Sequence, residues 1–298
     1  MTRRQLLALA AAPAVFSAPA GPIIGMIDTH IHLFEPATFP YHPNSTYQPP
    51  AEPLVPYLAF TKQAGIAHAL IIHPEPYQDD HRYLWHCFEQ ESPKHFFKGT
   101  ILLDPIDPKT PDRMEQMTKA HPGRIVAMRI HATNAPGDAP SKTGAIKNRD
   151  LSNPQIQQVW KKAADLGIAI QMHFLPHHAA EIAVLCKRFP EVPVVLDHMG
   201  RVGMGTPADI ASVMALAKFP KVYFKYSGWT YFKNMPVEPV VKRAHQEFGV
   251  DRILWGGLGM NAKEHQEALQ LFDKHWAFVS ESDRAKVRGQ NAARLFQF

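Results

Sequence analysis

The chain has 298 residues, of which 45% are hydrophobic and 20% charged, and its formal net charge is +5. A chain of this length can bury a sizeable core, either as one large α/β domain or as two smaller ones. Lysines and arginines are scattered and form no basic stripe, which argues against a nucleic-acid-binding protein. Two cysteines cannot form a disulfide framework, so Cys87 and Cys186 are expected to be small buried apolar residues.

Residues 1–20 have the pattern of an export signal. Arg3 and Arg4 precede an apolar run over 6–16, and a small-x-small cleavage site follows over 18–20. The paired arginines resemble the bacterial twin-arginine pattern. The apolar run is shorter than the roughly 20 residues that a membrane span needs. We therefore expect an exported protein, periplasmic or secreted, without stable membrane insertion, whose domain covers 21–298.

From residue 23 onward, short apolar runs alternate with longer segments of helical period. The runs that predict strands cover 23–33, 69–73, 97–103, 125–131, 168–174, 194–198, 222–227 and 253–256. The segments that predict helices cover 53–64, 81–91, 111–119, 154–166, 177–188, 207–218, 236–248 and 263–276, with a final helix over 283–296. Eight strand–helix units predict a single-domain (β/α)8 TIM barrel. A doubly wound sheet would more often carry a glycine-rich phosphate loop after the first strand, and the sequence has none there.

Two long segments rich in Pro, Ser, Thr and Asn, 35–53 and 132–153, follow predicted strands. In a barrel both would overhang the C-terminal ends of the strands, which is where active sites of this fold lie.

Histidines gather at the predicted strand ends. His30 and His32 are two residues apart on the first strand, so their side chains point the same way and can share a metal ion. Such a pair is weak evidence by itself, but four further histidines close other strands: His73, His131, His173 and His198. Barrel strand ends converge on one pocket, and unpaired buried imidazoles are costly, so we expect a joint functional site.

Cations and aromatic residues accompany the histidines. Arg129 precedes His131 by two residues on the fourth strand and could grip a substrate carboxylate with its planar fork, or form a buried structural ion pair. Lys225 on the seventh strand is a second candidate, although the sequence does not decide whether its side chain points into the barrel. Trp229 and Tyr231 follow and could flank a substrate ring or pack within a loop.

Several motifs together resemble the amidohydrolase-related family. They are the first-strand pattern Ile27-Asp28-Thr29-His30-Ile31-His32, the lone His173, the sixth-strand Asp197-His198-Met199-Gly200 and the terminal Asn291-Ala292-Ala293-Arg294-Leu295-Phe296. More narrowly, the chain looks like the amidohydrolase 2 branch, which includes lactone hydrolases and a decarboxylase, over essentially all residues after 22. The resemblance implies that His30, His32 and His173 bind a divalent ion, usually zinc. It also implies that His198 is a fourth ligand or polarises the substrate.

The eighth strand departs from the family pattern. The family typically reads Gly-Ser-Asp-Trp where this chain reads Gly256-Gly257-Leu258-Gly259, so Leu258 occupies the place of the aspartate. A leucine can neither bind metal nor take a proton. Three interpretations stay open: a zinc site of histidines alone, a substitute carboxylate, or a site that works without metal or only binds a ligand. The candidate substitutes are Glu264, Glu75 and Asp79.

The resulting hypothesis is a metal-assisted hydrolase of a small anionic lactone or related carbonyl compound. His198 and His173 would act in catalysis, and the substrate would be bound by Arg129, His131, His73 and Lys225. A decarboxylase on the same fold and a non-catalytic binding barrel are the alternatives, because fold alone does not choose between them. The expected partner is a small molecule and no nucleic acid, and a homo-oligomer is left open.

Overall fold

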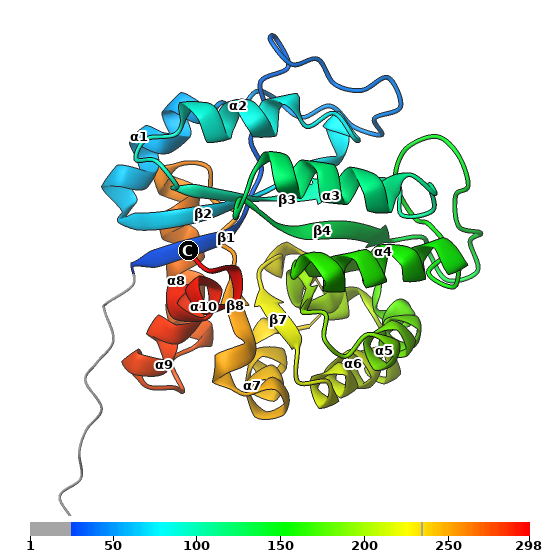
Figure 1. Ribbon diagram of the computed structural model, residues 1–298. Coiled ribbons are helices and arrows are strands. Elements are labelled where there is room, and N and C mark those ends of the chain that lie inside the picture. The colour runs from blue at the N-terminus through cyan, green and yellow to red at the C-terminus, as the bar shows by residue number, and fades with distance from the viewer. Residues whose placement is uncertain (1–24, 234) are drawn as a thin grey trace, which may run out of the picture.

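The computed structural model describes residues 25–233 and 235–298, so the predicted export signal over 1–20 lies outside the described residues. Eight parallel strands form one sheet in the order β1 to β8. The sheet curls into a nearly closed barrel, and helices cover its outside (Figure 1). The predicted (β/α)8 barrel is confirmed.

The strands are β1 Met26–Ile31, β2 Ile66–Ile72, β3 Phe97–Leu102, β4 Ile125–Ala132, β5 Ala169–Phe174, β6 Val194–Leu196, β7 Val222–Tyr226 and β8 Ile253–Trp255. Alternate residues of each strand face the barrel interior, where a compact apolar cluster forms. It contains Ile27, Leu70, Ile72, Ala127, Ala169, Val195 and Leu254, and residues of the last helix pack against it. Polar side chains are therefore excluded from this end of the barrel and gather nearer the other end.

The helices are α1 Leu54–Ala64, α2 Arg82–Gln90, α3 Thr110–Ala120, α4 Pro154–Leu166, α5 Ala179–Arg188, α6 Pro207–Met214, α7 Val237–Phe248, α8 Ala262–His275, α9 Glu281–Ala285 and α10 Asn291–Phe296. Local chemistry sets both ends of α4. The Asn153 side chain accepts a hydrogen bond at the start of α4, and Gly167 ends that helix with a φ of 66°. Their apolar faces and the outer faces of the strands form the main core, in which both cysteines are buried.

The predicted sixth strand and the predicted last helix are among the elements that differ from the structure. The sixth strand stops at Leu196, because the next residues turn into the left-handed region from His198 to Arg201. The predicted last helix over 283–296 is interrupted by a π-helical turn, Lys286–Gln290, between α9 and α10. Gly289 in that turn lies against the Gly25 carbonyl, where an added Cβ would approach to 2.5 Å. Close contact with the start of β1 therefore accompanies the irregular turn.

Side chains close the barrel between its first and last strands. The Thr29 hydroxyl of β1 donates to the Trp255 carbonyl of β8 over 2.7 Å. Lys225 Nζ donates to the Thr29 carbonyl over 2.9 Å, and the Gly257 N–H donates to Asp28 Oδ1 over 2.9 Å. The β1–β8 seam, as we call this junction, thus depends on residues next to the histidine cluster.

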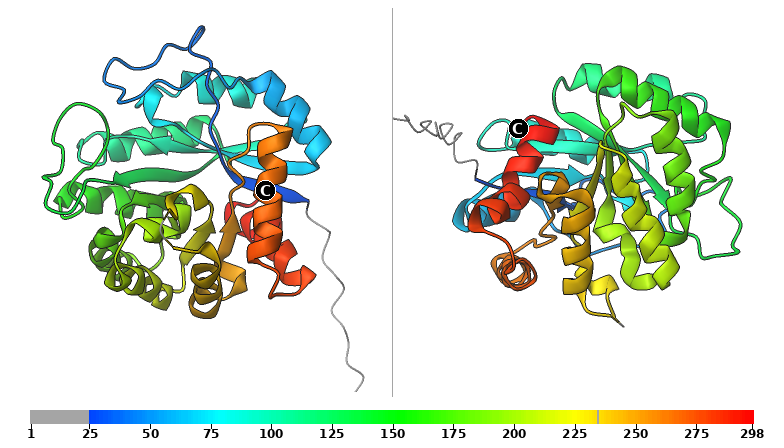
Figure 2. Two further views of the ribbon diagram at one scale, coloured as in Figure 1. Left: turned by 180° about the vertical axis from the view of Figure 1, so that it is seen from behind. Right: turned by 90° about the horizontal axis from the view of Figure 1, so that it is seen from below.

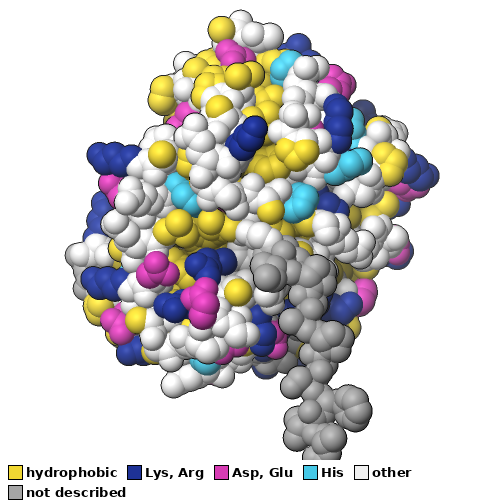
Figure 3. Space-filling model, turned by 90° about the vertical axis from the view of Figure 1, so that its left-hand side faces the viewer, with side chains coloured by type: hydrophobic (Ala, Val, Ile, Leu, Met, Phe, Trp, Pro, Cys, Tyr) yellow, Lys and Arg dark blue, Asp and Glu magenta, His cyan; other side chains and the backbone are white. Residues whose placement is uncertain are grey.

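The two long loops overhang the C-terminal ends of the strands, as predicted; Figure 2 shows them projecting from one side of the barrel. They enclose a cavity of about 660 Å³, to which Tyr47 contributes from one loop and Lys147 from the other. The opposite side of the molecule carries lysine and arginine side chains interspersed with acidic ones (Figure 3). Among the described residues, no helix is both long and apolar enough for a membrane span.

Candidate active site

A buried carboxylate, Asp197, lies at the base of the site. It follows β6 and is fully buried. Arg129 of β4 donates to its Oδ2 through Nε and approaches the same oxygen through Nη2, both at 2.9 Å. Gln171 of β5 donates to both oxygens, at 2.8 and 2.9 Å, and Lys225 Nζ of β7 lies 3.0 Å from Oδ1. These side chains meet because alternate positions on neighbouring strands face the interior.

Burial and the neighbouring charges shift the pKa values of this network in opposite directions. Burial alone would raise the pKa of Asp197, but the charges of Lys225 and Arg129 outweigh it and hold that pKa well below its usual value. Burial lowers the pKa of Lys225, whereas the charge of Asp197 raises it and partly offsets that effect. Asp197 is therefore ionised and lies between two cations. Its negative charge in turn offsets much of theirs.

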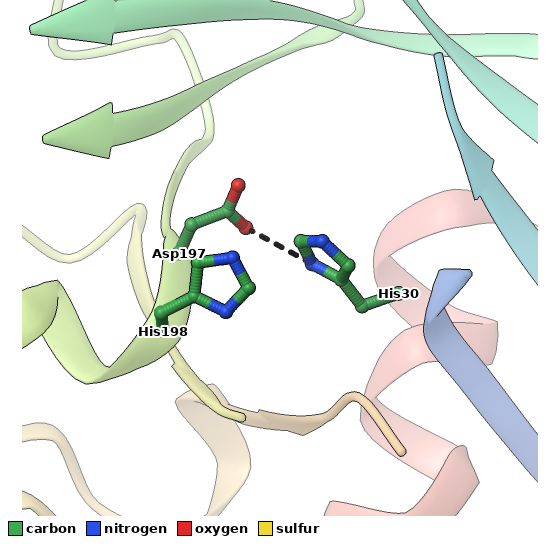
Figure 4. A group of neighbouring side chains, drawn as sticks. All are labelled: His30, Asp197 and His198. Carbon is green, nitrogen blue, oxygen red and sulfur yellow. Dashed lines mark ion pairs between the residues drawn. The ribbon is translucent and has the colours of Figure 1, made fainter. Parts of the chain in front are cut away.

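His30 lies beside this carboxylate with an unsatisfied ring. Its Nδ1 is 3.7 Å from Asp197 Oδ1, and neither ring nitrogen has a hydrogen-bond partner in the described part of the chain although the residue is fully buried. His198 completes the group, and one donor atom from each of the three residues lies within 4.8 Å of the others. Figure 4 shows the three side chains converging from β1 and from the segment after β6. Such buried, unpartnered nitrogens usually indicate a functional role.

The other imidazoles extend this group into a row of rings. Ring centroids lie 5.0 Å apart for His32 and His30, and 4.4 Å apart for His30 and His198. The row continues over 5.3 Å from His198 to His173 and over 4.9 Å from His173 to His131. Five of the six predicted histidines thus form one connected cluster, drawn from β1, β4, β5 and the turn after β6.

Every ring in the row favours its neutral form. Burial is the leading cause that lowers the pKa of His30, His131, His173 and His198 well below the ordinary value. Burial and the charge of Arg129 lower the pKa of His32 to about 4. A neutral imidazole keeps one nitrogen lone pair that a metal ion or a proton can occupy.

A strained turn positions His198. Residues His198, Met199, Gly200 and Arg201 all have φ between 49° and 60°, which makes one left-handed turn. For residues other than glycine this region costs roughly 1–2 kcal/mol each. The turn is held by close packing, since an added Cβ at Gly228 would lie 2.7 Å from His198 Cβ. His198 Nδ1 and Ser227 Oγ are hydrogen-bonded at 3.1 Å. Strain of this kind is concentrated at functional sites.

The predicted site residues divide into three groups. The cavity is lined by His32, Arg129, His131, His173 and His198, with Tyr231 among the aromatic candidates. His30 and Lys225 lie beneath it, in contact with Asp197. His73 is turned away, because its Nε2 bonds to the Gln78 carbonyl at 3.0 Å and its ring stacks on His81. Trp229 packs near Tyr226 and not on the cavity.

The residues grouped closely enough to share one ion overlap the implied ligands in part. The family resemblance implied His30, His32 and His173, with His198 as a possible fourth ligand, and the grouped donors belong to His30, Asp197 and His198. His32 and His173 lie one ring further out on either side. The motif Asp197-His198 was visible in the sequence, but the strand pattern alone did not show that β6 ends before it.

The three candidate substitutes for the missing aspartate lie in different environments. Glu264 accepts a hydrogen bond from the Met260 N–H, and Asp79 pairs with Arg113. Glu75 lines the cavity; its Oε2 has no partner among the described residues, and burial raises its pKa. Leu258 has a φ of 57°, so it lies in the left-handed region, which a leucine rarely adopts.

The arrangement partly fits a divalent metal. Both ring nitrogens of His30 lack partners among the described residues, and His198 offers Nε2 because its Nδ1 bonds to Ser227; imidazole nitrogen is a donor type that zinc binds. Asp197 fits less well, because both of its oxygens already accept hydrogen bonds and two cations contact it. An ion here would therefore be held by His30 and His198, with Asp197 adjacent.

Comparison with known proteins finds two relatives that are named as lactone hydrolases. It is 27% identical over 264 residues to 4-sulfomuconolactone hydrolase of Rhizobium radiobacter, covering 82% of this chain and 77% of that protein. It is 24% identical over 314 residues to L-fucono-1,5-lactonase of Burkholderia ambifaria, covering 91% and 95%. The crystal structure of a zinc-bound amidohydrolase from Burkholderia multivorans has the same fold, with a TM-score of 0.68, 16% identity and coverage of 92% and 99%.

Residues 27–298 match the sequence model of the amidohydrolase 2 family, described as Amidohydrolase. The match covers β1 to α10 and includes the histidine row, Asp197 and the cavity. Because it spans far more than half of the chain, this protein belongs to the amidohydrolase 2 family of enzymes.

Proposed function

We propose that this protein hydrolyses a small anionic lactone in the cavity above the histidine row. One observation carries the proposal: neutral imidazoles with unpartnered nitrogens converge beside Asp197, at the end of the barrel where this fold places its active sites. Histidines in this state can take a proton from water, which hydrolysis of an ester requires.

His198 is the best placed proton acceptor. It lines the cavity, and its Nδ1 is engaged by Ser227, which orients the ring and leaves Nε2 for the reactants. Water adds to the lactone carbonyl while His198 takes a proton from it. The proton then goes to the ring oxygen as the carbon–oxygen bond breaks, and the product is the open hydroxy acid or its keto form. His173, whose ring lies 5.3 Å from that of His198, is the second proton-transfer candidate.

The fixed charges beneath the row have a supporting role. Arg129 lines the cavity, but two of its nitrogens contact Asp197, so we assign it to positioning that carboxylate beside His30. Lys225 has the same task from β7. A divalent metal held by His30 and His198 would supply a Lewis acid for the carbonyl oxygen, and because Nε2 of His198 would then be a ligand, proton transfer would pass to His173.

The relatives support lactones as the substrate class. One is named for a lactone bearing a sulfo group and the other for a sugar lactone, and both alignments cover most of this chain. The zinc of the Burkholderia multivorans structure is consistent with a metal in this fold. The missing eighth-strand aspartate, replaced by Leu258, is the reason that we place proton transfer on the histidines.

The first test is hydrolysis of a panel of small lactones, with and without a carboxylate, followed by proton release. We expect His198→Asn to lower kcat by about 100-fold or more, the usual contribution of a general base. His68→Asn is the matched control, because that ring lies against Phe298 and is not among the residues that line the cavity. Carbon dioxide release without ring opening would instead indicate a decarboxylase.

Metal content is measured on the same preparations, purified without chelator. We expect about one equivalent of zinc or a related ion, and we expect His30→Ala to abolish it. Retention of the ion in the His30→Ala protein would show that the metal is held elsewhere. Undiminished lactone hydrolysis by the His198→Asn protein would reject the proton-transfer role.

A further inference from the structure

Arg201 differs from the other cations of the site because no carboxylate neutralises it in the described part of the chain. Arg129 and Lys225 both contact Asp197. Arg201 lines the cavity, and its hydrogen bond among the described residues goes to the hydroxyl of Tyr231, at 2.9 Å from Nη2. Its Nε is buried and has no partner there. A buried donor without an acceptor is unfavourable. A ligand that brings an acceptor to this nitrogen would therefore be stabilised here.

The guanidinium is held in place before any ligand arrives. Its carbon lies 4.3 Å from the centre of the Tyr231 ring, so the cation stacks on the aromatic face. The backbone of Arg201 belongs to the same left-handed turn as His198. Gly203 brings this segment against η5 (Trp229–Tyr231), because an added Cβ there would lie 2.7 Å from the Tyr231 carbonyl oxygen. The proton acceptor His198 and the cation are thus fixed by one short, rigid segment.

The surroundings of Arg201 also favour an anion. His131 and His173 line the same cavity with ring nitrogens that lack partners, and Lys147 reaches it from the loop after β4 without a carboxylate partner among the described residues. Two acids line the cavity as well. Asp138 is exposed, and Glu75 accepts hydrogen bonds from the Thr46 N–H and from Gln78; in the described part of the chain neither acid forms an ion pair with Arg201.

We infer that Arg201 binds a carboxylate of the substrate, away from the carbonyl that is attacked near His198, and that it makes the enzyme select anionic over neutral lactones. A guanidinium fork matches the two oxygens of a carboxylate, and such charged hydrogen bonds are stronger than neutral ones. The selection of lactones rests on the proposed function, whereas the carboxylate site itself does not depend on it.

Binding is measured by calorimetry with benzene-1,3-dicarboxylate and with the matching diamide, neither of which can be hydrolysed. We expect the unmodified protein to bind the dicarboxylate and to bind the diamide far more weakly. Arg201→Gln should weaken dicarboxylate binding by about 10- to 100-fold, which corresponds to the loss of a charged hydrogen bond. Arg201→Lys keeps the positive charge but loses the planar guanidinium. Its dicarboxylate affinity should lie between those of Arg201→Gln and the unmodified protein.

The matched control is Arg243→Gln, because Arg243 lies on α7, half exposed and only 3.8 Å from Glu247. It should bind like the unmodified protein. Thermal unfolding of each variant checks that Arg201→Gln is folded, and Arg201→Lys provides the test if it is not.

Activity then separates the two proposals. With a carboxylated and an uncharged lactone, Arg201→Gln should lower the ratio of kcat/KM for the first to kcat/KM for the second by about the same 10- to 100-fold. Equal dicarboxylate affinity in Arg201→Gln and the unmodified protein, or equal affinity for diacid and diamide, overturns the carboxylate site. Arg201-dependent dicarboxylate binding without hydrolysis of any lactone keeps the carboxylate site and removes the lactonase.

Discussion

Asp28 shows how one residue of the site depends on its surroundings. It is fully buried, and its Oδ1 accepts hydrogen bonds from the N–H groups of His30 and Gly257, both at 2.9 Å. Its Oδ2 has no partner among the described residues, and an added Cβ at Gly257 would lie 2.7 Å from it. Burial raises the pKa of Asp28 from 3.8 to about 7, although the two backbone donors and Lys225 lower it. The folded protein therefore binds a proton here that the unfolded chain has already lost.

This residue predicts a pH dependence of stability. Between pH 4 and 7 the unfolded chain loses the Asp28 proton while the folded state keeps it, so the free energy of unfolding decreases as the pH rises through this window. Asp28→Asn mimics the protonated form and removes the effect. We expect the substituted protein and the unmodified one to be similar in stability at pH 4 and to diverge by up to about 4 kcal/mol at pH 8, the equivalent of about three pKa units.

Urea denaturation at several pH values measures this difference. The relevant quantity is the gap between the two proteins, because the buried histidines contribute equally to both. A gap that stays constant from pH 4 to pH 8 would show that the Asp28 carboxyl titrates normally.

At the scale of elements, the segment between β6 and α6 distinguishes this site. A strand that continued through 198, as its apolar pattern suggested, would leave Arg201 in an extended segment. Instead, η3 (Asp197–Met204) begins at the end of β6, and the left-handed turn within it brings His198 and Arg201 to the same cavity. Gly200, at the centre of this turn, has a φ of 60° and packs so closely that an added Cβ would lie 2.7 Å from Val213 Cγ1 and 3.3 Å from Phe174 Cζ.

Gly200→Ala therefore combines backbone strain with a steric clash. We expect it to lower the free energy of unfolding by about 2–4 kcal/mol, since the left-handed conformation costs an alanine about 1 kcal/mol and overpacking adds about 1–3 kcal/mol. Gly123→Ala is the matched control. Its φ is 70°, but an added Cβ meets nothing within 4 Å, so only the strain of about 1 kcal/mol applies. Equal losses in the two variants, measured by chemical denaturation, would mean that the packing around the turn adapts.

At the scale of the whole molecule, the residues that close the barrel at the β1–β8 seam lie next to the active site. The other seven junctions are parallel ladders with backbone pairing. The seam relies on the Thr29 hydroxyl, the Lys225 ammonium and the Asp28 carboxyl group. Two of these residues also touch the network around His30, so the stability of the barrel and the geometry of the site share the same contacts.

Thr29→Val tests the seam, because it keeps the side-chain shape and removes the hydroxyl. We expect a loss of about 1–3 kcal/mol in the free energy of unfolding, since the Trp255 carbonyl is left without this donor. Hydrogen exchange should be faster for β1 and β8 than for β4 and β5 in the unmodified protein, and faster still in the variant. Uniform exchange protection around the barrel in both proteins would contradict a weak seam.

The sequence by itself determined the barrel and the identity of most of the histidine row. Strand alternation and eight repeated units are local patterns, and the C-terminal ends of parallel strands must meet. His30, His32, His131, His173 and His198 can therefore be grouped from their positions along the chain. Export also rests on local residues alone, and it stays a prediction.

Only the tertiary structure decided which charges are available. The sequence singled out Arg129 for a substrate carboxylate, but Asp197 contacts it. Arg201, which the sequence patterns did not single out, bonds only to a tyrosine hydroxyl among the described residues. His73 lies at a strand end like the others, yet a neighbouring carbonyl and His81 hold its ring elsewhere. The physical reason is that pairing of buried charges depends on distances of about 3–4 Å between residues far apart in the chain, which no local periodicity encodes.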